Sequence, residues 1–176
     1  MTDKSGSAQQ AIIVMGVSGC GKSSVGALLA KRLGLSFVEG DALHPPANVE
    51  KMAKGTPLTD DDRWPWLTRI GHDIAAAQSA GEGIVVSCSA LKQSYRDLLR
   101  REAGGPLHFV YLEGSHALLL SRMGARTGHF MPVALLDSQL ATLEVPTGEP
   151  GVVTVSIDQS VEDIVEGAIR GLTPSF

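Results

Sequence analysis

The sequence has few of the features that mark secreted, membrane-bound or nucleic-acid-binding proteins. Its two cysteines, Cys20 and Cys88, are too few for a disulfide framework and suit a reducing compartment. No apolar run approaches the roughly 20 residues of a membrane span, and residues 1–10 read as a flexible polar lead-in rather than a signal peptide. The net charge of −4 gives no basic field for nucleic acid or an anionic membrane. We therefore expect a cytoplasmic protein that holds anionic ligands through local clusters of cations.

The chain of 176 residues, 43% of them hydrophobic, is long enough for one compact domain, 1–176. Apolar runs of strand type alternate with helical patterns along its length. Strands are expected at 11–15, 36–39, 84–87, 107–112 and 152–157, and helices at 24–33, 47–54, 59–80, 91–102, 116–126, 132–144 and 161–172. The third helix could instead begin near Pro65. This alternation predicts a three-layer α/β fold with a five-stranded, mainly parallel sheet, helices on both faces and a short lid at about 122–133.

A glycine-rich loop between the first strand and the first helix fits G-x-x-x-x-G-K-[ST] at every fixed position. Glycines let the backbone curl so that its N–H groups point at phosphate oxygens, and the helix N-terminus adds positive potential. Lys22 is expected to reach the β- and γ-phosphates of ATP, and the Ser23 hydroxyl to bind Mg²⁺. The residues expected to contact the nucleotide are Gly16, Val17, Ser18, Gly19, Cys20, Gly21, Lys22, Ser23 and Ser24. The loop predicts a P-loop NTPase fold, against the alternative of a glycine-rich structural turn.

Two absences narrow the class of P-loop protein. The run Ile84-Val85-Val86-Ser87 does not end in the acid that would offer Mg²⁺ a Walker-B ligand, and no Asn-Lys-x-Asp tetrad for reading guanine is present. Both absences count against a GTPase or a motor ATPase. The chain is also too short to add a large mechanical domain to a P-loop core.

Several blocks beyond the phosphate loop resemble the gluconokinase family of small P-loop carbohydrate kinases. They are Gly40-Asp41-Ala42-Leu43-His44-Pro45, Asp60-Asp61-Asp62-Arg63, Cys88-Ser89-Ala90-Leu91-Lys92 and Gly128-His129-Phe130. The resemblance runs over nearly the whole chain. It implies an enzyme that phosphorylates D-gluconate to 6-phospho-D-gluconate by direct in-line transfer from ATP with Mg²⁺, and a homodimer is a further expectation from the family. The alternatives are a kinase for another small anionic acceptor, such as shikimate, and an ATP-binding sensor without catalysis.

Three residues after the second strand are candidates for the acceptor side. The resemblance implies that Asp41 orients the acceptor hydroxyl and is a candidate general base, against a loop carboxylate that caps a turn. Glu39 is a candidate Mg²⁺ ligand through water, against a strand-end residue that faces solvent. His44 precedes two prolines, so its backbone is expected to be non-helical, and it is expected either to bond a sugar hydroxyl or to be structural.

Cations on two further segments are candidates for binding the substrate. Arg63 is expected to clamp the substrate in a planar, two-pronged geometry, against an exposed ion pair with one of the preceding aspartates. Ser89 and Lys92, in the turn after the third strand, are expected to form an anion site with backbone N–H groups. Arg96, one helical turn beyond Lys92, is expected to point the same way. This site would take the substrate carboxylate or the γ-phosphate.

The lid segment carries the remaining candidates. Arg122 and Arg126 are four residues apart on one helical face and are expected to stabilise charge on the transferring phosphoryl group, against a solvated basic face. His129 is expected to cap the acceptor pocket. Asp158 follows the fifth strand, where related folds place a loop that contacts adenine.

Overall fold

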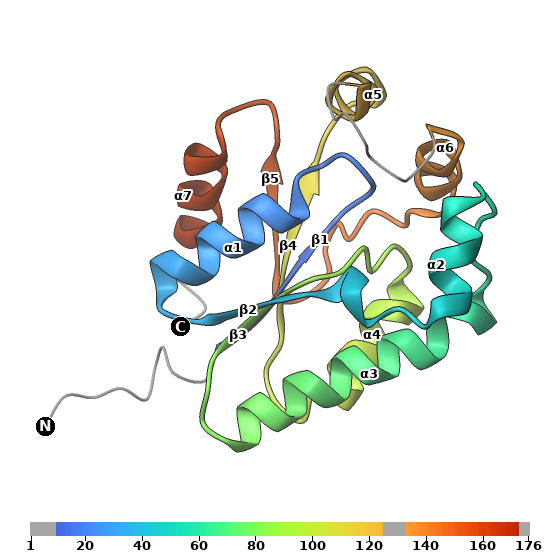
Figure 1. The fold of residues 1–176 in the computed structure, drawn as a ribbon. Helices are drawn as coiled ribbons and strands as arrows, with labels where there is room; N and C mark the ends of the chain where they lie inside the picture. Colours follow the sequence, from blue (N-terminus) through green and yellow to red (C-terminus); the bar gives the residue numbers. More distant parts are fainter. Residues whose placement is uncertain (1–9, 125–132, 173–176) are drawn as a thin grey trace, which may run out of the picture.

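A sheet of five parallel strands forms the centre of the molecule (Figure 1). The computed structural model describes residues 10–124 and 133–172, and the strand order is β2-β3-β1-β4-β5. The central strand β1 is buried along its whole length, as expected for a strand covered on both faces. The strands are β1 Ala11–Met15, β2 Ser36–Glu39, β3 Ile84–Ser87, β4 His108–Glu113 and β5 Val152–Ser156. All neighbouring pairs are parallel, so the carboxyl ends of the strands meet at one edge.

Helices cover both faces of the sheet, so the predicted three-layer arrangement is confirmed. α1 and α7 pack together on one face, and α3 and α4 pack together on the other (Figure 1). α5 and α6 lie above the carboxyl edge, and α2 contacts the start of α3 through hydrogen bonds from Asn48 and Lys51 to Asp62. The helices are α1 Lys22–Leu33, α2 Pro46–Ala53, α3 Asp60–Ser79, α4 Gln93–Glu102, α5 His116–Gly124, α6 Val133–Thr142 and α7 Val161–Leu172, with a 3₁₀ turn, η1, at Gly40–Leu43. No helix in the described ranges is both long and apolar enough to cross a membrane.

Two helix starts can be compared with the expectations: the start of α3 at the acids after Thr59 is confirmed, and the start of α4 differs. α3 begins at Asp60 and not near Pro65, because Thr59 and Asp62 form a reciprocal capping box that stabilises the first turn. Pro65 lies inside this helix, where it offers no N–H to the carbonyl one turn earlier. α4 begins at Gln93, two residues later than expected. Most of the expected lid lies outside the described residues, as do Arg126 and His129.

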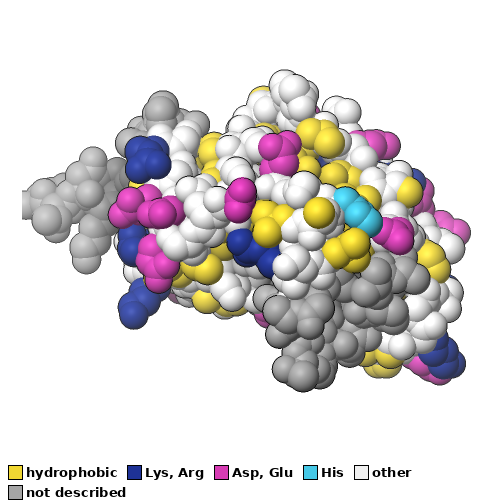
Figure 2. All heavy atoms as spheres, turned by 90° about the horizontal axis from the view of Figure 1, so that it is seen from above, with side chains coloured by type: hydrophobic (Ala, Val, Ile, Leu, Met, Phe, Trp, Pro, Cys, Tyr) yellow, Lys and Arg dark blue, Asp and Glu magenta, His cyan; other side chains and the backbone are white. Residues whose placement is uncertain are grey.

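The carboxyl edge of the sheet is where the loops after the strands meet. Gly40 permits the tightest of these approaches, because a Cβ there would lie 1.9 Å from the carbonyl oxygen of Ser87. The chain can therefore leave β2 directly against β3 and carry Asp41 to the edge. Figure 2 views the molecule from above, onto this edge, and shows acidic and basic side chains interspersed among the described residues of this face.

Candidate active site

The loop after β1 presents an uncapped helix N-terminus. Gly21 precedes α1 with φ 91° and ψ 25°, a left-handed conformation that glycine adopts readily. The start of α1 has neither a side-chain cap nor an acid in its first turn, so its N–H groups and positive dipole end can serve an anion. The Lys22 ammonium lies over the loop, 3.2 Å from the Val17 carbonyl oxygen. The loop thus has the geometry that a phosphate cradle requires.

A carboxylate from β2 contacts the end of this loop, although β3 lies between β1 and β2 in the sheet. Glu39, at the end of β2, accepts hydrogen bonds from the Ser23 hydroxyl at 2.5 Å and from the Ser87 hydroxyl at 2.5 Å. Ser87 in turn accepts from the backbone N–H of Gly40 at 3.2 Å. Ser23 and Glu39 are the two predicted Mg²⁺ ligands, and their hard oxygens fit that ion. The described residues contain no group of three acids, histidines or cysteines for a metal, so the ion would need phosphate oxygens as well.

One cavity joins the phosphate loop to the expected acceptor side. Ser18 and Lys22 line it from the loop, and α6 closes it with Ser138 and Gln139. The acceptor side contributes Asp41, His44, Arg63 and Ser89, with apolar contacts from Met52, Pro57, Leu58 and Trp66. Residues that are far apart in sequence therefore meet within one small space. A ligand there would touch both the phosphate loop and the predicted substrate residues.

Arg63 is a buried cation in this cavity. It is 8% exposed, and its guanidinium donates to the Tyr95 hydroxyl at 2.7 Å. The guanidinium carbon also lies 5.3 Å from the centroid of the Tyr95 ring, and the Tyr95 hydroxyl donates a hydrogen bond to Asp60. Within 10–124 and 133–172, no carboxylate forms an ion pair with Arg63, so the alternative of an exposed ion pair is wrong. A buried guanidinium without a counter-ion is poised for an anionic ligand.

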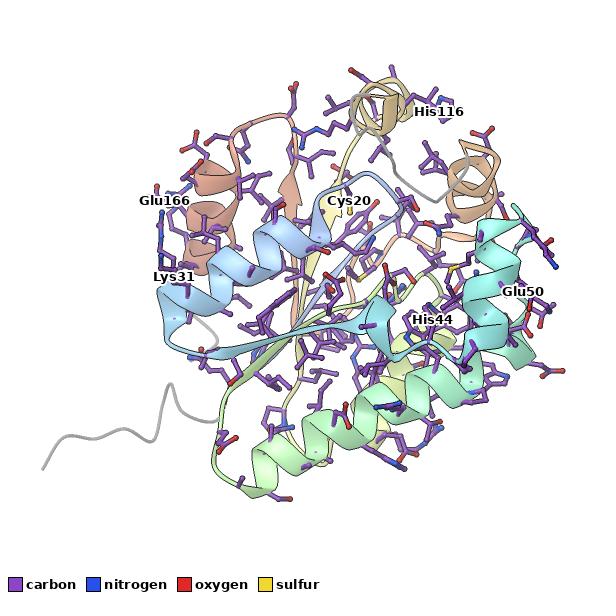
Figure 3. The ribbon with its side chains drawn as sticks, viewed as in Figure 1. Cys20, Lys31, His44, Glu50, His116 and Glu166 are labelled. Carbon is purple, nitrogen blue, oxygen red and sulfur yellow. The ribbon has the colours of Figure 1, made fainter. Side chains whose placement is uncertain are left out.

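His44 lies between the end of β2 and helices α2 and α3 (Figure 3). Its side chain is 3% exposed and stacks on Trp66, with ring centroids 3.9 Å apart and an interplanar angle of 17°. Trp66 is fixed by a hydrogen bond to the Gly40 carbonyl. Burial lowers the pKa of His44 from 6.5 to about 4, although the nearby Asp41 carboxylate acts in the opposite direction. The ring is therefore neutral near pH 7 while it lines the cavity.

Comparison with known proteins identifies the family. A family model described as an AAA domain matches residues 12–146. A gluconokinase of Gluconobacter oxydans is 53% identical over 160 residues, which cover 90% of this chain and 89% of that protein. The thermosensitive gluconokinase of Escherichia coli is 43% identical over 161 residues, which cover 90% of this chain and 85% of that protein. A crystal structure of a gluconokinase from Sinorhizobium meliloti 1021 superposes with a TM-score of 0.87 at 56% identity, covering 95% of this chain and 93% of that one.

The chain belongs to the gluconokinase family. The matched range of the family model, residues 12–146, includes both the phosphate loop and the segments that form the acceptor side. The resemblance inferred from the sequence blocks is thereby confirmed.

In this gluconokinase-family chain, only part of the anion site expected in the turn after β3 lies at the cavity. The Lys92 ammonium pairs with Asp60 at 3.1 Å and lies outside the residues that line the cavity. The backbone N–H of Gln93, at the helix start, donates to the Glu144 carboxylate at 2.9 Å. The Lys92 ammonium is therefore paired with an acid of the chain, and the role expected for the backbone N–H groups of residues 89–92 stays a prediction. Of the three residues predicted to bind the substrate from this segment, Ser89, Lys92 and Arg96, only Ser89 lines the cavity.

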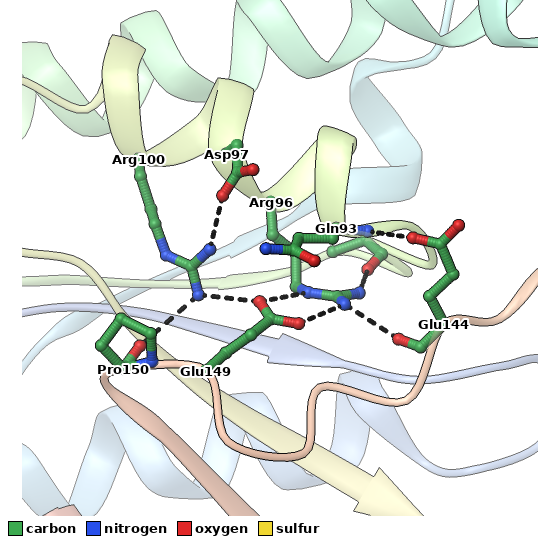
Figure 4. A network of polar contacts seen from close by, with 8 residues as sticks. Gln93, Arg96, Asp97, Arg100, Glu144, Glu149 and Pro150 are labelled. Carbon is green, nitrogen blue, oxygen red and sulfur yellow. Dashed lines mark hydrogen bonds and ion pairs between the residues drawn. The ribbon is translucent and has the colours of Figure 1, made fainter.

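Arg96 is a structural residue, and its predicted role in substrate binding is wrong. The side chain is fully buried and bonds both oxygens of Glu149, at 2.9 and 2.6 Å, and the carbonyls of Ala90 and Glu144 (Figure 4). The helical spacing from Lys92 does not hold, because Lys92 precedes the first helical residue. Hydrogen bonds from Arg96 and Arg100 hold the pKa of the Glu149 carboxyl below its usual range, although burial opposes this.

Two residues predicted to contact the nucleotide, Arg122 at the phosphoryl group and Asp158 at adenine, lie close to one another. Arg122, from α5, donates to the carbonyl of Ile157 at 2.5 Å. Ile157 immediately precedes Asp158, which is exposed after β5. This contact places the Arg122 guanidinium beside the loop predicted to meet adenine, and its action on the phosphoryl group stays a prediction.

Four polar residues of the site were not indicated by the sequence patterns. Ser138 and Gln139 line the cavity from α6, and the Gln139 side-chain oxygen accepts from the Ser18 backbone N–H at 2.8 Å. Ser87 holds Glu39, and Tyr95 holds Arg63. Each is an uncharged residue inside an ordinary helix or strand pattern. Only the packing of distant elements gives these residues a place in the site.

Proposed function

We propose that this protein transfers the γ-phosphate of ATP to the 6-hydroxyl of D-gluconate. Family membership supports the reaction, since relatives at 43–53% identity are named gluconokinases. The observation that carries the proposal for this chain is the single cavity that joins Ser18 and Lys22 to Asp41 and Arg63. A sugar acid in that cavity would bring a hydroxyl to the end of a triphosphate without a second binding site.

The charges of the cavity suit a sugar acid and a triphosphate. Lys22 and the N-terminus of α1 would hold the phosphates. The buried guanidinium of Arg63 would bind the substrate carboxylate through two parallel hydrogen bonds. Asp41 would accept a hydrogen bond from a substrate hydroxyl and so orient it. These contacts would fix both reactants, and positioning with charge stabilisation supplies most of the catalysis in phosphoryl transfer.

The Mg²⁺ ion belongs to the same proposal. Ser23 and Glu39 would hold it beside the phosphate tail, where it supplies neutralisation of developing charge. Arg122 and Arg126 would add positive charge from the lid, and His129 would cap the pocket. We further infer a single catalytic domain that works in the cytoplasm, as a homodimer, without nucleic acid or membrane as a partner.

An acceptor panel tests the proposal directly. Purified protein is incubated with ATP, Mg²⁺ and gluconate, other sugar acids, polyols or shikimate, and ADP release is followed. We expect release that depends on gluconate, and a phosphate ester on carbon 6 by NMR. ADP release that gluconate does not stimulate, or a preference for shikimate, would overturn the substrate assignment.

A matched pair of lysine variants separates catalysis from a role in sensing. Lys22→Ala should abolish acceptor-dependent turnover. Lys31→Ala, an exposed residue in the last turn of α1 and far from the loop (Figure 3), should leave it unchanged. Equal turnover in the two variants would contradict the role of the phosphate loop.

A further inference from the structure

The amide of Asn48 occupies a fixed orientation between two helices and a histidine. Asn48 is 3% exposed, and its side-chain nitrogen donates to the backbone carbonyl of Asp62 at 2.9 Å. The same nitrogen lies 3.2 Å from Nδ1 of His44. A carbonyl oxygen can only accept a hydrogen bond, so the contact with Asp62 establishes which end of the amide is the nitrogen.

The orientation of this amide determines where His44 carries its proton. The Asn48 nitrogen has only hydrogens to offer, so Nδ1 of His44 must accept. A neutral imidazole with an accepting Nδ1 carries its proton on Nε2. Burial and stacking on Trp66 disfavour the charged ring. The ring is therefore a neutral imidazole that donates from Nε2 and not from Nδ1.

The donor end of this ring faces a carboxylate across a gap. Nε2 of His44 lies 3.9 Å from Oδ1 of Asp41, which is too long for a direct hydrogen bond. One hydroxyl oxygen between the two atoms could lie within hydrogen-bonding distance of each. Both residues line the cavity, and the other charged group that faces His44 is Arg63. The gap thus has a donor on one side and an acceptor on the other.

We propose that Asn48 is a positioning residue that locks His44 as an Nε2–H donor, so that His44 and Asp41 together read one hydroxyl of the acceptor. His44 donates to the hydroxyl oxygen, and Asp41 accepts the hydroxyl hydrogen. A carbonyl at the same place accepts from His44 but has nothing to give Asp41, so the pair selects an alcohol over a ketone. The identity of the alcohol rests on the proposed function, whereas the state of the ring does not.

The state of the ring can be read without substrate. Long-range ¹H–¹⁵N spectra of histidine-labelled protein report which ring nitrogen is protonated, and His44→Gln identifies the His44 signals among five histidines. We expect an Nε2–H tautomer in the wild-type protein at pH 7. An Nδ1–H tautomer or a charged ring would overturn the proposal, and this result needs no variant of Asn48 to fold.

Two variants of α2 separate the effect of Asn48 on the His44 tautomer from a general weakening of the packing between α2 and α3. Asn48→Asp offers Nδ1 a carboxylate, so it should shift the signals to a ring protonated on Nδ1. Lys51→Ala removes the other contact between α2 and Asp62, a 2.8 Å ion pair, without touching His44, and should leave the signals unchanged. Unchanged signals in folded Asn48→Asp, or an equal shift in Lys51→Ala, would overturn the lock.

Kinetics then connect the ring to substrate selection. Asn48→Asp should raise KM for gluconate about tenfold, which is the usual effect of losing one hydrogen bond, and should leave KM for ATP unchanged. Lys51→Ala should leave both unchanged. If KM for gluconate were unaltered in Asn48→Asp, the proposal that His44 and Asp41 together bind one substrate hydroxyl would be wrong. Absence of gluconate turnover in wild-type protein with the Nε2–H tautomer would instead refute the proposed function and leave the lock standing.

Discussion

The hydroxyl of Ser23 and the carboxylate of Glu39 lie 2.5 Å apart, although they come from α1 and β2. β3 lies between β1 and β2 in the sheet, and its last residue, Ser87, bonds the second oxygen of Glu39. The serine stands where a Walker-B acid would end the third strand. The adjacent strand supplies the carboxylate instead.

Removing the Glu39 charge should weaken the response to Mg²⁺. We expect Glu39→Gln to raise the half-saturating Mg²⁺ concentration about 10- to 100-fold, the usual effect of losing a contact at a metal site. The measurement is turnover against Mg²⁺ at saturating ATP, with binding of a Mn²⁺–nucleotide complex as a second readout. Glu50→Gln, an exposed acid in α2 that pairs only with Lys54 among the described residues, is the control. Equal Mg²⁺ dependence in the two variants would contradict a role for Glu39.

Arg63 should be irreplaceable by lysine. Arg63→Lys keeps the charge but loses the planar fork, so KM for gluconate should rise about 10- to 100-fold while KM for ATP changes little. Tyr95→Phe, which removes only the hydroxyl that holds the guanidinium, should give a smaller rise. Arg69→Ala, exposed on the same helix, is the matched control. A rise confined to KM for ATP would indicate that Arg63 binds the nucleotide and not the acceptor.

Arg96 should matter for stability and not for binding. Arg96→Ala leaves the buried Glu149 carboxylate with Arg100 alone and removes the side-chain donor from the Ala90 and Glu144 carbonyls, and should lower the free energy of unfolding by about 3–5 kcal/mol. Urea unfolding measures this loss. Glu149→Gln should cost less, because the amide still accepts hydrogen bonds. A folded Arg96→Ala protein with wild-type stability and weakened gluconate binding would restore the role first predicted for Arg96.

Acid should destabilise the fold through His44. Its pKa is 6.5 in the unfolded chain and about 4 in the folded protein, so the unfolded state takes up the proton first as the pH falls. The contribution is therefore fully present above about pH 6.5 and is lost progressively towards pH 4, by on the order of 1–3 kcal/mol. Urea unfolding from pH 7.5 to 4 measures it.

A second histidine contributes to the same pH window and must be separated from His44. Burial also lowers the pKa of His108, so the wild-type slope contains both. His44→Gln should flatten most of the slope, and His108→Gln the remainder. A slope that His44→Gln does not change would mean that the ring titrates normally in the folded protein.

The strands and the phosphate loop could be predicted from sequence because their causes are local. Buried parallel strands have continuous apolar runs, and all five lie within one residue of the expected bounds. The acids after Thr59 indicated a helix start, and the capping box confirms it. Gly16 to Ser23 needs only its own spacing to be recognised. The positions of Asp41, His44 and Arg63 in one cavity follow from the sheet order, which the β–α alternation predicts only in outline.

The errors at the start of α4 have a non-local cause. Glu144 and Glu149 reach Gln93 and Arg96 from about 50 residues along the chain, and no local pattern shows that their loop folds back there. The places of Asn48, Ser87 and Gln139 could not be predicted for the same reason. Uncharged side chains become important only when another element brings a partner.

The order of the strands sets the spacing of the proposed site residues along the carboxyl edge of the sheet. β1, with the phosphate loop, is central, β2 with Asp41 is at one margin, and β5 with Asp158 is at the other. The two edge strands, β2 and β5, are four strand spacings apart, which corresponds to about 19 Å. Main-chain hydrogen bonds between neighbouring strands fix that distance. If the proposed function is correct, substitutions at the β2 margin can therefore change acceptor preference without altering the spacing of the strands that carry the phosphate loop and Asp158.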